Sequence, residues 1–161
     1  MASYHSLAFQ YENRQKYYRS NVNFSHSGFA WACTRRFYEN MKELMPYEIL
    51  GSGDYRSALA HFNKDTLCYS EGHKSLLEDL KSRVKYCRLG YVPGVIMHYY
   101  HGAKANRGYN TRYKQLVKHK FDPNTMLDKD EQGLLIPNEN FPKELLKYIK
   151  DYFRSRLEDG E

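Results

Sequence analysis

The segment that most constrains this chain is Gly90-Tyr-Val-Pro-Gly-Val-Ile-Met-His-Tyr-Tyr-His-Gly102, an apolar run that ends in two histidines and a glycine. Its length and its internal Pro-Gly pair disfavour a helix and predict a short buried strand. A strand that delivers imidazoles at its end is a common way to build a metal or catalytic site. His98 and His101 lie three residues apart and would face opposite sides of a continuing strand, so only a turn between them could aim both at one ion. A site with one histidine, or with no metal, is therefore favoured over a two-histidine site.

Strands and helices are expected to alternate along the rest of the chain. Short apolar runs predict strands, and apolar residues at helical spacing predict amphipathic helices. The expected strands are 28–34 and 66–69, and the expected helices are 35–44, 55–62, 74–89, 106–120 and a closing helix from 141. This alternation predicts the α/β class, with a short mixed sheet flanked by helices.

The length of 161 residues fits one domain, or half of a larger one. Residues 1–25 are polar and aromatic without a sustained period, and are expected to form an N-terminal arm. Residues 158–161 are expected to fray, which leaves 26–157 as the structured region.

The composition favours polar or anionic partners. Sixteen Tyr and eight Phe stand against one Trp, and tyrosine combines ring packing with a hydroxyl that can bind sugars or bases. The formal net charge of +6 favours phosphates, nucleic acid or acidic glycans, although ordinary solubility requires a similar excess.

The spacing of the cysteines and the lack of a long apolar run indicate the cellular compartment in which the protein is expected. Cys33, Cys68 and Cys87 lack the close paired spacing of zinc ligands, which favours reduced thiols. No apolar run approaches the roughly 20 residues that a membrane span needs, and the N-terminus does not read as a signal peptide. We therefore expect a soluble, cytoplasmic protein with no membrane partner.

Gly51-Ser-Gly-Asp54 places a carboxylate at a helix start behind a flexible turn, where free amides favour its charged form. A carboxylate held in this way could act as a general base or bind a sugar hydroxyl. A plain helix cap, by Ser52 or Asp54, is the commoner explanation. The turn lacks the signature of a phosphate loop.

Two further stretches have competing interpretations. Asp128 and Asp130 fit part of a calcium loop and part of a sugar-transferase acidic dyad, but an exposed acidic turn explains them better. The densest basic stretch could bind a diphosphate, could bind single-stranded nucleic acid, or could be a solvated helix face. It comprises Lys104, Arg107, Arg112, Lys114, Lys118 and Lys120, interleaved with Tyr109 and Tyr113.

Three motifs in order resemble the C-terminal half of a glycosyltransferase with the GT-A fold. They are Gly28-Phe-Ala-Trp-Ala with Arg35-Arg36, Ile49-Leu-Gly-Ser-Gly-Asp54, and the Gly90 to Gly102 segment. The resemblance covers roughly residues 24–135 and is nearest to glycosyltransferases of large viruses, phages and bacteria. It is more distant to the galactosyltransferase group. An ordered set of motifs is more specific than any single one.

This resemblance implies hexosyl transfer from a nucleotide-sugar donor to a glycan or protein acceptor. Asp54 would be the acceptor-side carboxylate or base, and a divalent ion, Mn²⁺ or Mg²⁺, would be the cofactor. The acceptor would contact Trp31, Gly51, Ser52 and Gly53, the metal would bind His98 or His101, and the donor diphosphate would meet Lys104 and Arg107.

The sequence departs from the family pattern in two ways. One carboxylate stands where the galactosyltransferase loop has adjacent acidic residues, and the N-terminal nucleotide-binding half is not among these residues. We therefore expect a half-enzyme that needs its missing part, or an oligomer, for full activity. The alternatives are a basic nucleic-acid or partner-binding module without catalysis, and an inactive remnant of the fold.

Overall fold

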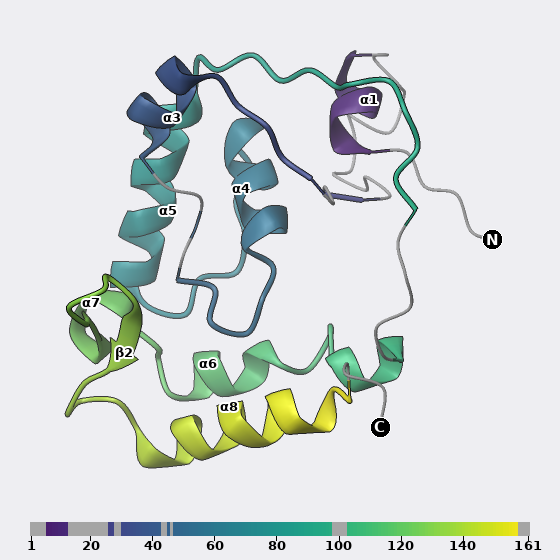
Figure 1. Cartoon of the computed structure of the whole chain (residues 1–161). Helices are drawn as coiled ribbons and strands as arrows, with labels where there is room; N and C mark the ends of the chain where they lie inside the picture. Colours follow the sequence, from purple (N-terminus) through teal and green to yellow (C-terminus); the bar gives the residue numbers. More distant parts are fainter. Residues whose placement is uncertain are drawn as a thin grey trace. The chain divides into compact units, whose positions relative to one another are not determined.

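A computed structural model describes residues 6–12, 26–27, 30–42, 45, 47–97 and 103–157. These described residues form seven α-helices, one short 3₁₀ helix and one two-stranded antiparallel sheet, so the predicted mixed α/β class is confirmed (Figure 1). The chain packs as two compact units. Unit 1 is Met1–Thr66 with Leu77–Met97, and unit 2 is Leu67–Leu76 with His98–Glu161.

Unit 1 is built from helices α1 (Leu7–Glu12), α3 (Arg35–Met41), α4 (Gly53–His61) and the larger part of α5 (Glu71–Val84). The hydroxyl of Thr34 caps α3 by accepting a hydrogen bond from the backbone N–H of Phe37 at 3.2 Å. Its buried apolar residues include Leu50 before α4 and a set at helical spacing on α4 and α5: Ala58, Leu59, Leu77, Leu80 and Val84.

Unit 2 contains the start of α5, a 3₁₀ helix η1 (Lys104–Arg107), and helices α6 (Tyr113–Lys118), α7 (Pro123–Met126) and α8 (Lys143–Ser155). Strands β1 (Leu127–Lys129) and β2 (Leu135–Pro137) pair with Asp128 opposite Ile136. Helices α6 and α8 run side by side and bury Leu116 and Leu145 completely (Figure 1).

The helices expected from apolar spacing at 35–44, 55–62, 74–89 and from 141 are confirmed as α3, α4, α5 and α8. The helix expected over 106–120 is shorter, because η1 ends at Arg107 and α6 begins only at Tyr113. Gly108, which follows η1, has a left-handed φ of 51° that interrupts the helical backbone.

The three predicted strands are wrong where the structure describes them. Residues 30–34, 66–69 and 90–97 have no strand, and Val92 and Val95 are 86% and 92% exposed rather than buried. A strand forms only when a neighbouring strand accepts and donates its backbone hydrogen bonds. None of the described residues pairs in this way with residues 30–34, 66–69 or 90–97. An apolar run specifies the residues of a strand but not its partner.

Part of the expected N-terminal arm is helical. Leu7–Glu12 forms helix α1 and buries Leu7 and Gln10.

In the part of the chain that the structure describes, no helix has both the length and the apolar composition to cross a membrane.

Candidate acceptor-side site

The turn before α4 has a shape that depends on its glycines. Gly51 and Ser52 have left-handed φ angles of 90° and 76°, and the Gly51 N–H donates to the Glu48 carbonyl oxygen at 2.7 Å. A Cβ on Gly53 would lie 2.9 Å from the Met45 carbonyl oxygen, closer than a real side chain approaches. Ser52 is the N-cap residue of α4 by position, but its hydroxyl makes no capping bond. The glycine loop therefore lets α4 start close against the preceding backbone.

Asp54 lies exposed in the first turn of α4. The Ser27 hydroxyl donates a hydrogen bond to the Asp54 carboxylate, although the two residues are 27 positions apart. The first turn of a helix favours a negative charge because its backbone N–H groups lack carbonyl partners. The loop thus presents to solvent a carboxylate that the Ser27 hydroxyl orients.

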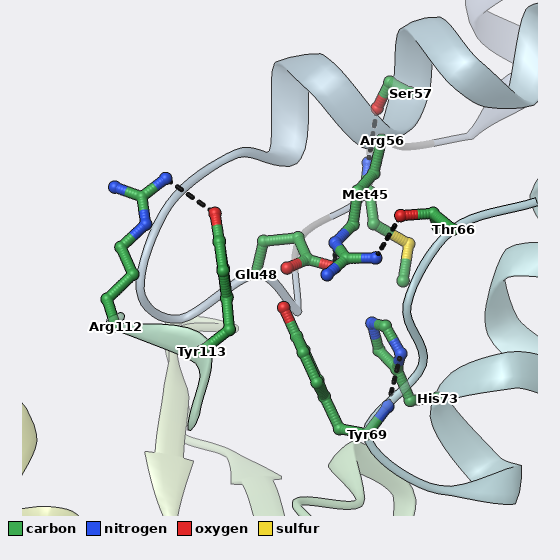
Figure 2. Close-up of polar contacts among 9 residues, drawn as sticks. All are labelled: Met45, Glu48, Arg56, Ser57, Thr66, Tyr69, His73, Arg112 and Tyr113. Carbon is green, nitrogen blue, oxygen red and sulfur yellow. Dashed lines mark hydrogen bonds and ion pairs between the residues drawn. The ribbon is translucent and has the colours of Figure 1, made fainter. Parts of the chain in front are cut away.

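A buried ion pair supports this loop from inside. The Arg56 Nε lies 2.6 Å from the Glu48 Oε1, and the two side chains are only 4% and 2% exposed. The Arg56 Nη1 donates to the Thr66 hydroxyl at 3.0 Å, and the Met45 N–H donates to the Ser57 hydroxyl at 3.3 Å (Figure 2). Because Glu48 precedes the glycine turn and Arg56 follows it, the pair fixes both ends of the turn.

The sequence interpretation missed the residues that hold Asp54. Ser27 lies 27 positions before Asp54, and the residues around Ser27 do not indicate a contact with a distant carboxylate. Glu48 and Arg56 are eight residues apart across a turn, so neither i,i+3 nor i,i+4 spacing reveals their pairing.

Trp31 lies at the other end of α4 from Asp54. Its ring centroid is 5.8 Å from that of His61, the last residue of the helix. Seven residues at 1.5 Å each separate Asp54 from His61, or about 10 Å along the helix axis. The expected acceptor residues therefore fall into two groups, the Gly51 to Asp54 loop and Trp31, at opposite ends of one helix.

The expected donor-side residues belong to unit 2, whereas Asp54 belongs to unit 1. Arg107 ends η1; its carbonyl oxygen accepts from the Tyr152 hydroxyl at 3.0 Å, and its Nη1 donates to the Tyr109 hydroxyl at 3.1 Å. The backbone of Lys104 begins η1, and its side chain lies outside the described atoms.

Arg112 belongs to the basic stretch for which ligand binding and a solvated helix face were both open, but it is an internal residue with 4% of its surface exposed. Its guanidinium donates to the Tyr113 hydroxyl at 2.6 Å (Figure 2) and to the Tyr152 hydroxyl at 3.2 Å. It also lies 4.9 Å from the ring centroids of Tyr109 and Tyr113. Burial opposes its charge, but the hydrogen bonds to Tyr152 and Tyr113 outweigh burial and hold its pKa above the ordinary value. Arg112 therefore joins α6 to α8.

Asp130 shapes the hairpin between β1 and β2. Its Oδ1 accepts from the N–H groups of Gln132 at 2.9 Å and Leu134 at 2.8 Å, and Gly133 supplies a left-handed φ of 81°. Asp128 is exposed on β1. These bonds fit the exposed acidic turn that the sequence favoured over a calcium loop.

The predicted metal ligands His98 and His101 lie outside the described residues. Within the described ranges, no group of three or more His, Cys, Asp or Glu side chains is placed to hold a metal ion. Asp54 with Ser27 offers one carboxylate and one hydroxyl, which is not a ligand set for a divalent ion.

Comparison of the chain with protein-family models, with curated proteins and with solved structures finds no match. The functional proposal accordingly depends on the site and on the motifs that compose it.

Proposed function

We propose that this chain is the acceptor-side half of a GT-A glycosyltransferase that transfers a hexosyl group from a nucleotide sugar to a glycan or protein. The observation that carries the proposal is the exposed Asp54 carboxylate, oriented by Ser27 at the start of α4. A buried ion pair and a glycine turn hold it in place. Such support behind one exposed carboxylate suits a catalytic group better than a simple helix cap.

In this proposal Asp54 acts as general base toward the acceptor. The acceptor hydroxyl oxygen forms a bond to the anomeric carbon of the donor sugar while its proton passes to the Asp54 carboxylate. The bond from that carbon to the diphosphate oxygen breaks, and its electron pair leaves with the nucleotide diphosphate. Lys104 and Arg107 are the residues that the family resemblance implies for binding the donor diphosphate.

His98 and His101 are the residues that would hold a divalent ion. Such an ion would supply positive charge that offsets the charge on the leaving nucleotide. Mn²⁺ and Mg²⁺ are the ions that the family resemblance implies.

Nucleotide release from UDP-hexoses and GDP-hexoses tests the proposal. The full chain is incubated with each donor, with Mn²⁺ or Mg²⁺ and a mixture of oligosaccharides, and free nucleotide diphosphate is measured. Replacing Asp54→Asn should lower the rate about a hundredfold or more, because the amide cannot take the proton. Absence of release from every donor, together with absence of UDP and GDP binding by calorimetry, would overturn the proposal.

Glu71→Gln is the matched control. Glu71 is 94% exposed in the first turn of α5, so this change also removes a carboxylate from a helix start. Its rate should equal that of the unchanged chain. If Asp54→Asn released nucleotide as fast as Glu71→Gln, Asp54 would be an ordinary helix-start residue and not the general base.

The basic binding module is the second candidate. Lys114, Lys118 and Lys120 are exposed, and Tyr109 is 48% exposed beside them. A steep fall in oligonucleotide affinity with added salt would favour this candidate. The internal position of Arg112 counts against it, because one of the six basic groups is committed to tyrosine hydroxyls.

A further inference from the structure

Three aromatic rings meet at the C-terminal end of α4. The ring centroid of His61 is 5.8 Å from that of Trp31, at an interplanar angle of 58°, and 6.0 Å from that of Phe37, at 26°. Trp31 lies in the segment 30–34 that leads into α3 (Figure 1), and Phe37 lies in α3 itself. All three side chains are half-buried, so each keeps part of its surface toward solvent. We call Trp31, Phe37 and His61 the aromatic cluster.

The hydrogen bond of His61 fixes which ring nitrogen can bind a ligand. The Nδ1 lies 2.8 Å from the Ser57 carbonyl oxygen. A carbonyl oxygen only accepts, so Nδ1 carries the proton and donates. In the neutral imidazole the Nε2 is then an acceptor with a lone pair. A half-buried tryptophan beside an imidazole acceptor combines apolar surface with one orienting polar atom, as carbohydrate and small-molecule sites do.

We infer that the aromatic cluster is a binding subsite for a pyranose ring of the acceptor, which makes the acceptor a glycan. The apolar face of the sugar lies against the Trp31 ring, and one sugar hydroxyl donates to the His61 Nε2. The identification of this sugar as the acceptor rests on the proposed function. The sugar binding itself does not require Asp54.

The distance between the cluster and Asp54 defines the kind of glycan. Ser27 contacts Asp54 at the start of α4, and Trp31 contacts His61 at its end, about 10 Å further along the axis. A sugar whose hydroxyl reaches Asp54 is therefore not the sugar that lies on Trp31. The acceptor is an oligosaccharide whose reacting residue and bound residue are different units of one chain.

The fluorescence of Trp31 tests this inference directly, because it is the only tryptophan in the protein. The full chain is titrated with maltotriose, cellotriose, chitotriose and lactose as probes, with free tryptophan amide as the solvent control. At least one oligosaccharide should produce a saturable change in emission that the corresponding monosaccharide produces only at higher concentration. No saturable change with any of these sugars, or the same change in tryptophan amide, would overturn the inference.

Variants then assign the binding to the cluster. His61→Phe keeps a stacked ring but removes the Nε2 acceptor, and should weaken sugar affinity about three- to tenfold by calorimetry. Trp31→Leu should abolish binding, with thermal unfolding used to verify that the fold persists. Tyr38→Leu is the matched control, since Tyr38 is 51% exposed on α3 next to Phe37 and makes none of the cluster contacts.

The outcomes separate this inference from the proposed function. Asp54→Asn should leave the Trp31 response unchanged while nucleotide release falls. Sugar binding that His61→Phe and Tyr38→Leu weaken equally would overturn the role of His61. A fluorescence response to a short single-stranded oligonucleotide that exceeds every sugar response would also overturn the inference, because bases would then occupy the cluster.

Discussion

Two buried arginines are held in opposite ways in the two units. In unit 1, Arg56 contacts a carboxylate, that of Glu48, and the pair is almost fully withdrawn from water. In unit 2, Arg112 is equally buried, but its guanidinium donates hydrogen bonds to the hydroxyls of Tyr113 and Tyr152. One charge is neutralised by an opposite charge, and the other is solvated by phenols and aromatic faces.

This difference shows how each unit depends on its arginine. Two mutually buried charges are strongly interdependent, because removal of one leaves the other desolvated and uncompensated. An arginine bound by several neutral groups loses one contact at a time. We therefore expect the support behind Asp54 to fail abruptly and the junction of α6 with α8 to weaken in steps.

The largest expected effect is from Glu48→Gln, which keeps the size of the side chain and removes its charge. The free energy of unfolding of unit 1 should fall by about 3–5 kcal/mol, because Arg56 remains buried without its counter-charge. Urea unfolding followed by Trp31 fluorescence measures this. The double variant Glu48→Gln/Arg56→Met should recover most of the loss, and a single-variant cost below about 1 kcal/mol would contradict the interdependence.

Tyr152→Phe should have the second-largest effect. The hydroxyl accepts from the Arg112 Nη1 and donates to the Arg107 carbonyl oxygen, so its removal costs about 1.5–3 kcal/mol in unit 2. Faster amide hydrogen exchange should appear in peptides of α6 and α8. Tyr148→Phe is the comparison, since it removes a hydroxyl from a neighbouring turn of the same helix. Equal exchange in the two variants would argue against the Tyr152 network.

Thr66→Val should cost less, about 1 kcal/mol in unit 1. Arg56 loses the hydroxyl acceptor of its Nη1 but keeps its ion pair with Glu48. The midpoint of urea unfolding, again followed by Trp31, reports the change. A cost as large as that of Glu48→Gln would mean that the hydroxyl, and not the carboxylate, holds the arginine.

Lys81 is a third buried cation and should give the smallest effect. Burial opposes its charge, but hydrogen bonds to Asp65 at 2.7 Å and Glu78 at 2.8 Å outweigh burial and raise its pKa. A raised folded pKa means that these contacts stabilise the protein fully below the ordinary lysine pKa and are lost as pH rises through the folded value. Stability should therefore fall above about pH 10.5.

Urea unfolding at pH 9 and pH 11.5 measures this loss. Because Asp65 and Glu78 are largely exposed, it should stay below about 1 kcal/mol. Lys81→Met should reduce the pH-dependence, and an unchanged slope in that variant would assign it to other groups. Tyr148, whose pKa is raised by burial, contributes a loss of the same sign in both proteins.

The sequence predicted the parts of the fold that short-range spacing controls. Apolar positions that the period places inward on α4, α5 and α8, such as Leu59, Leu80 and Leu145, are buried. Tyr55 on α4 and Phe153 on α8 are 40% and 47% exposed. The strands were wrong because a strand depends on a partner that spacing cannot identify. The β1–β2 hairpin was missed because its strands are three residues each, too short for a visible alternation.

The candidate site was predictable only in its exposed part. The glycine turn and Asp54 stand together in sequence, so their local pattern was visible. The contacts of Ser27 with Asp54 and of Trp31 with His61 join residues 27 and 30 positions apart, and no periodicity reports such pairs. The internal position of Arg112 was not predicted, because composition does not distinguish an internal cation from an exposed one.

The division of the chain into units has a consequence for its synthesis. The chain passes between the units three times, at Thr66, at Leu76 and at Met97, and the second of these points lies inside helix α5. As the protein leaves the ribosome, unit 1 stays incomplete until residue 97 has emerged. The decapeptide Leu67–Leu76 can pack into unit 2 only after the C-terminal segment has been synthesised. Neither unit is encoded by one continuous stretch of codons, so neither can be obtained by shortening the gene from its ends.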